Sequence, residues 1–155
     1  MRIRHIVFRL GGVLYPDLAS AVLSFPDRTD IGETSLLRIH GLAGLLVSGK
    51  ISKGDFLEKV CGLCEIHCSP ETLESHILNA GMHPDMTKLL DELSSRFSLS
   101  LLVDYPRCWL RLSSGWKNVR KYFPEEEYFY INDLGLDDEV DIFSTLIERD
   151  LVQPG

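Results

Sequence analysis

The sequence lacks the features that would place it in a membrane or on a nucleic acid. No apolar run approaches the roughly 20 residues that a helix needs to cross a bilayer, and the run behind Met1–His5 is too short for a signal peptide. Acidic residues outnumber basic ones, 23 against 16, giving a net charge of −7 where a nucleic-acid surface needs a basic patch. We therefore expect a cytoplasmic protein without membrane or nucleic-acid partners.

Cysteine is scarce, and its placement argues against a secreted disulfide framework. Three of the four cysteines fall between residues 61 and 68, so reduced thiols are expected. Nearby histidines at 67, 76 and 83 make zinc binding an alternative, but zinc sites usually take ligand pairs from two separated turns. The spacing of Cys61, Cys64 and Cys68 predicts one helical face, where free cysteine packs like a small apolar residue. Core packing is favoured, and no metal site is expected.

Internal repeats and low-complexity tracts are also missing, and 155 residues suffice for one domain with a real core. Short apolar runs predict strands at 5–8, 99–103 and 128–131. Helical spacing predicts helices at 84–96, at 109–122 with a break at 113–115, and from Asp137 onward. This alternation predicts an α/β fold with a parallel sheet and helices on its faces.

Residues 16–81 have helical character throughout and predict an insert behind the first strand. One helix is expected over 34–47, and a second behind Ser52. Ser69-Pro70 combines a capping serine with a proline suited to a first helical position. The insert is therefore predicted to hold three short helices.

Two charged residues follow predicted strands. Ligands of a parallel sheet bind beyond the carboxyl ends of its strands, where Arg9 and Asp104 are expected. The Arg9 guanidinium and the backbone N–H groups of Leu10, Gly11 and Gly12 could hold a small anion such as phosphate. The alternative is a decayed site in which Arg9 reaches solvent or pairs with an acid such as Asp104. An ion pair with Arg9 also competes with metal coordination by Asp104.

The segment Phe8-Arg9-Leu10-Gly11-Gly12-Val13-Leu14 resembles the first motif of a phosphatase-like subgroup in the haloacid dehalogenase-like (HAD) superfamily, with one residue changed. Leu101–Asp104 resembles the second motif, Ile131–Gly135 the approach to the third, and Gly49–Phe56 the helix-joining turn of a cap. The resemblance implies a Rossmann-like core over 1–16 and 82–155, a helical cap over 17–81, and magnesium-dependent hydrolysis.

Four departures set the chain apart from this pattern. Arg9 replaces the aspartate nucleophile, and a guanidinium cannot be deprotonated in a protein. Gly11 replaces the second acid, and Val103 or Asp104 replaces the hydroxyl of the second motif. Asp137-Asp138-Glu139 stands where a lysine is expected. No catalytic residue is therefore assigned, and the magnesium ligands that the resemblance implies are not present.

The fourth motif would add a strand with paired acids beyond the last helix, and the printed sequence ends at Gly155. Either the sequence is a fragment, or a partner chain or a second copy covers the open edge of the first strand. Three hypotheses follow. The favoured one is a HAD-like protein that has lost phosphohydrolase activity and retains anion or partner binding. The alternatives are a magnesium-dependent phosphatase represented by an incomplete chain, and an interaction module that pairs through the open sheet edge.

Overall fold

A three-stranded parallel sheet organises the structure, a computed structural model that describes residues 4–29, 31–113, 115–134 and 142–148. The sheet has the order β1 (His5–Arg9), β2 (Ser98–Val103), β3 (Tyr128–Tyr130). Phe8 lies opposite Leu101, and Leu102 lies opposite Phe129. The predicted α/β class and the three predicted strands are confirmed.

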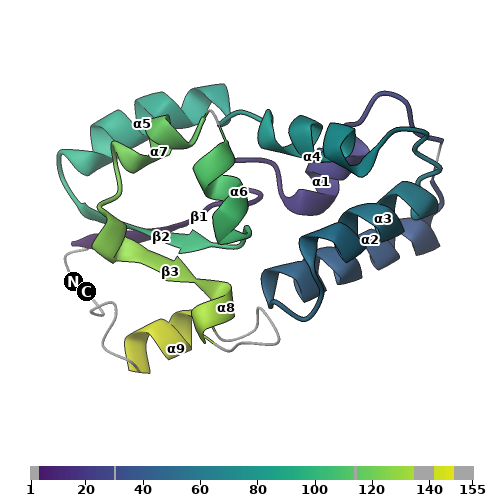
Figure 1. Cartoon of the computed structure of the whole chain (residues 1–155). Helices are drawn as coiled ribbons and strands as arrows, with labels where there is room; N and C mark the ends of the chain where they lie inside the picture. The colour runs from purple at the N-terminus through teal and green to yellow at the C-terminus, as the bar shows by residue number, and fades with distance from the viewer. Residues whose placement is uncertain (1–3, 30, 114, 135–141, 149–155) are drawn as a thin grey trace.

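Between β1 and the next core helix, the chain forms a group of helices beside the sheet (Figure 1), here called the helical insert. Its members are α1 (Leu18–Leu23), α2 (Glu33–Val47), α3 (Lys53–Leu63) and α4 (Pro70–Leu78). The prediction of three helices was wrong by one. The missing helix, α1, has only 6 residues, too few for helical spacing to stand out, and its Asp17 cap accepts a hydrogen bond from the Ser20 N–H.

Local sequence explains where two of these helices begin. Ser52 caps α3 in a capping box with Asp55, each side chain bonding the backbone N–H of the other residue. Ser69 caps α4 by accepting from the Thr72 N–H, and Pro70 occupies the first helical position. Caps of this kind stabilise a helix by about 1 kcal/mol each.

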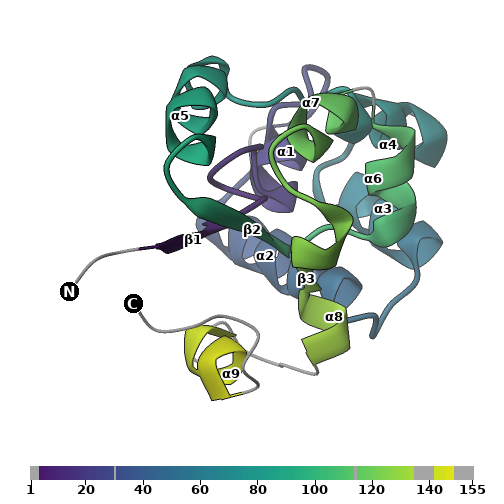
Figure 2. The ribbon, with the colours of Figure 1, turned by 90° about the vertical axis from the view of Figure 1, so that its left-hand side faces the viewer.

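The remaining helices cover the two faces of the sheet (Figures 1 and 2). They are α5 (Pro84–Ser94), α6 (Arg107–Leu112), α7 (Trp116–Arg120), the 3-10 turn η1 (Glu125–Glu127), α8 (Ile131–Leu134) and α9 (Ile142–Glu148). The predicted break at 113–115 separates α6 from α7, as expected. The predicted start of the last helix at Asp137 lies outside the described residues.

Residues of β2 alternate between two hydrophobic clusters. Leu101 and Val103 belong to the main core, which joins the sheet to α5, α6, α7 and the helical insert. Leu102 points the other way, into a smaller cluster with β3, α8 and α9. A strand buried on both faces explains why 99–103 is a nearly continuous apolar run in the sequence.

The cysteine prediction needs one correction. Helix α3 ends at Leu63, and Glu65 adopts a positive φ of 49°. Cys68 therefore lies beyond the helix, so the three cysteines do not share one helical face. They still pack as predicted, with Cys64 buried in the core and Cys61 and Cys68 partly buried against it.

The helical insert is fixed to the core through α4 and α6. The Glu74 carboxylate accepts hydrogen bonds from Trp109 Nε1 at 2.7 Å and from Lys53 Nζ at 2.8 Å. Trp109 is fully buried and makes an edge-to-face contact with Phe56. These contacts set the distance between the insert and the carboxyl ends of the strands. The division of the chain into two domains stays a prediction.

Among the described residues, no helix combines the length and apolar character needed to cross a bilayer.

Candidate functional site

The glycine turn behind β1 is held by a dense set of backbone hydrogen bonds. The Leu10 N–H donates to Leu102 O at 2.9 Å, which extends the β1–β2 ladder by one residue. The N–H groups of Leu14 and Tyr15 both donate to Leu10 O, and the Gly12 N–H donates to Tyr15 O. Gly12 has φ +78°, a left-handed conformation that glycine adopts without steric cost. The turn is thus a rigid platform at the end of the strand.

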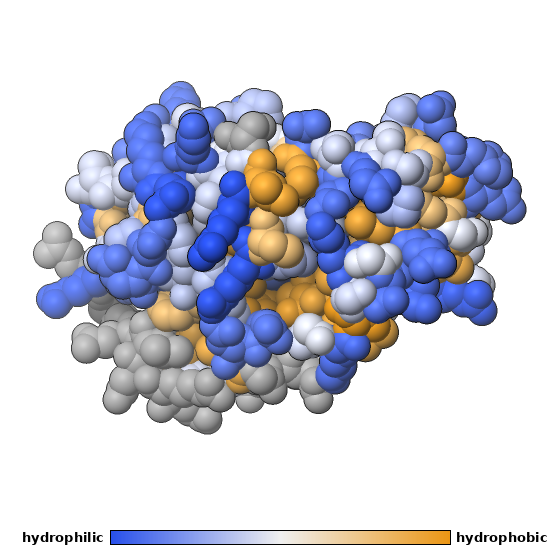
Figure 3. Space-filling view, viewed as in Figure 1, coloured by the Kyte–Doolittle hydropathy of each residue, from blue (hydrophilic) through white to orange (hydrophobic). Residues whose placement is uncertain are grey.

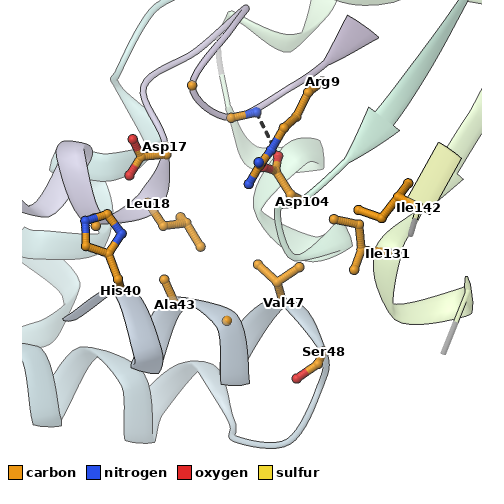
Figure 4. A pocket seen from close by; sticks show the side chains of 14 residues that line it. Arg9, Asp17, Leu18, His40, Ala43, Val47, Ser48, Asp104, Ile131 and Ile142 are labelled. Atoms are coloured by element: carbon orange, nitrogen blue, oxygen red, sulfur yellow. Dashed lines mark hydrogen bonds and ion pairs between the residues drawn. The ribbon is translucent and has the colours of Figure 1, made fainter. Parts of the chain in front are cut away.

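Arg9 and Asp104 meet at this platform, as the ion-pair alternative predicts. Arg9 Nε donates to Asp104 Oδ2 at 2.6 Å, and the Gly11 N–H donates to Oδ1 at 2.7 Å (Figure 4). Asp104 is 6% exposed, whereas the Arg9 side chain is 36% exposed. Both carboxylate oxygens therefore have a donor, and the buried negative charge has a cation beside it.

This arrangement requires glycine at position 11. A Cβ placed there would lie 2.8 Å from Asp104 Oδ2 and 2.9 Å from Oδ1, closer than a Cβ atom approaches a non-bonded neighbour. Glycine at position 11 and the position of the Asp104 carboxylate are therefore linked, because a side chain at residue 11 would enter the space that the carboxylate occupies.

A pocket of about 500 Å³ lies in front of the ion pair, between the carboxyl ends of the strands and helix α2. Figure 4 shows Arg9 and Asp104 on its core side, His40, Ala43 and Val47 along α2, and Ile131 and Ile142 at one end. Figure 3 shows apolar side chains gathered on the surface where the helical insert meets the core. The volume falls in the range of small-molecule sites, about 300 to 1,000 Å³.

Asp17 and His40 bring two further ionisable side chains to the pocket. Asp17 caps α1, and both of its oxygens accept hydrogen bonds from Ser20. Burial alone would raise the Asp17 pKa, but the Ser20 hydrogen bonds and the nearby His40 outweigh it, so the pKa lies below the ordinary value. Asp17 is therefore ionised at neutral pH.

The residues singled out from the sequence divide into two groups. Arg9, Gly11, Gly12 and Asp104 line the pocket. Leu10 and Val103 are each 1% exposed and belong to the main core, so Asp104 is the residue of the second motif that faces the pocket. The sequence analysis did not identify Asp17 and His40 as pocket residues. For Asp17, its position directly before the apolar run that begins at Leu18 was an available indication of a helix-capping residue.

The predicted anion-binding donors are engaged within the chain. The N–H groups of Leu10, Gly11 and Gly12 donate to Leu102 O, Asp104 Oδ1 and Tyr15 O. The Asp104 carboxylate is itself an anion bound by Arg9 and by the turn. Binding of an external anion at these residues stays a prediction.

The residues present do not fit the magnesium ion that the resemblance implies. Within the described ranges, no three His, Cys, Asp or Glu side chains lie close enough together to hold a metal ion. Asp104, which directly follows β2, has its oxygens bound by Arg9 and Gly11. Magnesium prefers several oxygen ligands in a near-octahedral arrangement, which this corner does not supply.

The turn, the parallel sheet and the helical insert define a Rossmann-like α/β protein with its pocket at the carboxyl ends of the strands. No protein-family model and no curated protein matches the sequence. Among solved structures, the chain is similar to a HAD family enzyme from Bacteroides thetaiotaomicron, with a TM-score of 0.66 and 16% identity over 99% of this chain and 81% of that one.

Two further structures of the same enzyme give matching results. The chain aligns with its complex with magnesium and inorganic phosphate at a TM-score of 0.60 and 16% identity, over 99% of this chain and 81% of that one. It aligns with the magnesium complex at 0.61 and 18%, over 98% and 80%. The fold is therefore HAD-like, as the first motif predicts.

Proposed function

We propose that this chain is a HAD-fold protein that does not carry out phosphoryl transfer and that uses the pocket at its strand ends for binding. The observation that carries this proposal is the Arg9–Asp104 ion pair, with 2.6 Å between Nε and Oδ2, at the strand end where the resemblance implies a nucleophile.

Neither member of the pair is suited to attack phosphorus. Arg9 stays protonated and has no lone pair to offer. Asp104 is an acceptor for two hydrogen bonds and is nearly inaccessible to solvent. An incoming phosphate would also have to displace the Asp104 carboxylate from Arg9 and the Gly11 N–H. That displacement would leave the buried Asp104 charge without its partners, which is costly in free energy.

The pocket nevertheless remains open beside the pair. About 500 Å³ is bordered by side chains of both the core and the helical insert, and the Glu74–Trp109 and Phe56–Trp109 contacts join the insert to the core. A preformed, partly apolar cavity with a few polar groups favours small-molecule binding. Loss of chemistry with retention of binding accounts for both features.

The test is hydrolysis of 4-nitrophenyl phosphate in the presence of magnesium, by the wild-type chain and by Arg9→Asp. We expect neither to release nitrophenol above the rate without protein, with circular dichroism showing that both are folded. Turnover by the wild type that is lost in Asp104→Asn contradicts the proposal. If Arg9→Asp hydrolyses the substrate and the wild type does not, arginine at position 9 is the change that prevents hydrolysis, and the rest of the site is still able to support it.

A second candidate function, pairing with another chain, is favoured by the edge of β1. Ser98 N–H bonds Arg4 O and Leu10 N–H bonds Leu102 O, so the even-numbered residues of β1 face β2. In a parallel ladder, the N–H and C=O groups of His5 and Val7 then point outward. No strand among the described residues pairs with that edge.

Sedimentation velocity at increasing concentration tests this candidate, and Val7→Pro, which removes an outward N–H, is expected to reduce association.

A further inference from the structure

The walls of the pocket are apolar along their middle and charged at two places. Leu18, Ala43, Val47, Ile131 and Ile142 supply the apolar part. In Figure 4, the Arg9–Asp104 pair lies on the core side, and Asp17 and His40 lie together away from Ile131 and Ile142. A ligand that fills this space therefore contacts hydrocarbon over most of its length and meets charge near its end.

The charge at Asp17 is the one that a ligand can neutralise. Arg9 and Asp104 bear opposite charges and lie 2.6 Å apart, so together they contribute almost no net charge. Asp17 has no ion pair with a lysine or arginine in the described ranges, and the nearby base is His40. Apart from His40, the ionisable side chains among the described lining residues, Arg9, Asp17 and Asp104, sum to a charge of −1.

Asp17 also has room for another donor. Its Oδ1 accepts from the Ser20 N–H at 2.9 Å and its Oδ2 from Ser20 Oγ at 2.7 Å. A carboxylate offers about four lone-pair positions, so acceptor capacity remains beside the donors from Ser20 and the Ala19 backbone. Because the capping bonds fix the carboxylate in place, a ligand donor does not have to immobilise it first.

We propose that the pocket binds a small molecule with an apolar body and one ammonium group, the ammonium lying at Asp17 and the apolar body against α2 and Ile131. This inference rests on the proposed binding function and names its ligand class. Asp17 would accept the ammonium hydrogen bonds, and the residues along α2 would exclude water from the hydrocarbon.

The same site is unfavourable for a free anion. Two carboxylates, Asp17 and Asp104, border the pocket. The backbone donors of the glycine turn are already bonded to Leu102, Asp104 and Tyr15. An anion would have to compete with Asp104 for Arg9, at close range and partly removed from solvent, where repulsion between like charges is strong.

The test compares two probes of equal shape and opposite charge, cyclohexylammonium and cyclohexanecarboxylate. Each is titrated into the isotope-labelled full chain, and binding is followed by NMR shifts of the Gly11, Gly12 and Gly44 amides. We expect the ammonium to bind at least about tenfold more tightly than the carboxylate, a preference of about 1.4 kcal/mol. Asp17→Asn, which retains a capping side chain, is expected to abolish that preference.

Asp55→Asn serves as the matched variant, because it makes the same substitution at a capping carboxylate of α3 that is not among the lining residues of the pocket; the ammonium preference is expected to persist. Equal affinities, a preference for the carboxylate, or no shifts with either probe overturn the inference. So does a preference that survives Asp17→Asn. Hydrolysis of 4-nitrophenyl phosphate is measured on the same samples, so a failure of the proposed function is recognised separately from a failure of the ligand class.

Discussion

The Asp104 carboxylate occupies the space that a side chain on residue 11 would enter. A Cβ on residue 11 would lie 2.8 Å from Asp104 Oδ2. The same carboxylate accepts the Gly11 N–H and the Arg9 Nε–H. Three of the positions at which the sequence differs from the motifs that it resembles are therefore in contact with one another. Arg9 and Gly11 both contact Asp104, which links the three positions.

Gly11→Ala is expected to destabilise the fold by about 1 to 3 kcal/mol, the usual cost of forcing extra volume into a packed site. The new methyl group has to push the Asp104 carboxylate away from the Gly11 N–H and from Arg9. Urea unfolding followed by tryptophan fluorescence measures the change. Gly41→Ala is the control, because no atom lies within 4 Å of its Cβ position and alanine favours a helix by about 1 kcal/mol. Equal effects of the two substitutions contradict the close approach at Gly11.

The Arg9–Asp104 pair is expected to show a coupling energy of about 1 to 2 kcal/mol. A fully buried pair loses about 3 to 5 kcal/mol when one partner is removed, but Arg9 is 36% exposed and solvent screens part of the interaction. The measurement is a double-mutant cycle of Arg9→Met and Asp104→Asn in urea. Additive effects of the two substitutions show that the charges do not interact.

The strands and the strand-end residues could be predicted because local sequence determines them. A β2 strand buried on both faces leaves a nearly continuous apolar run, and Ser52 and Ser69 mark helix starts through hydrogen bonds within four residues. The Rossmann-like order follows from such local features, and the likeness to solved HAD family structures agrees with it.

The composition of the pocket could not be predicted, because it depends on how distant segments pack. Asp17 and His40 meet Arg9 only after the insert docks on α6 through Glu74 and Trp109. The Cys61–Cys68 face was mispredicted for a related reason: spacing assumes that a helix continues, and the positive φ at Glu65 ends it. The sequence likewise left Arg9 with either a bound anion or Asp104 as its partner, and the ion pair became visible in three dimensions.

Glu74→Ala is expected to destabilise the chain by about 1 to 3 kcal/mol, because it leaves the buried Trp109 N–H without its acceptor. Glu74→Gln keeps an amide oxygen for Trp109 and should cost less. Thermal melting of both variants tests this ordering. If glutamine costs as much as alanine, the lysine ion pair rather than the tryptophan bond carries the interaction, since both variants lose the Lys53 contact.

Ser100 is expected to contribute about 1 kcal/mol through a polar contact inside the sheet. Its buried hydroxyl donates to Glu127 and is 2.6 Å from His5 Nε2, which joins β1 and β2 to the turn before β3. Ser100→Ala removes the shared hydroxyl while leaving its partners half-exposed, so water can replace part of the loss. Urea unfolding at neutral pH measures the change in the free energy of unfolding. If Glu127→Gln lowers stability by a similar amount, and the double variant loses less than the sum of the two single effects, the change is assigned to this contact.

The cap of α1 is expected to make stability depend on pH through Asp17. Burial opposes ionisation, but hydrogen bonds from Ser20 and the nearby His40 lower the Asp17 pKa below the ordinary value of 3.8. A carboxyl group with a lowered folded-state pKa adds stability above its unfolded pKa and loses that contribution as the pH falls through the folded one. Asp17→Asn keeps a capping side chain that does not titrate. The stability difference between wild type and Asp17→Asn, measured by urea unfolding from pH 7 down to pH 3, should therefore shift in favour of asparagine as the solution is acidified. A difference that stays constant over this range contradicts an ionised Asp17 cap.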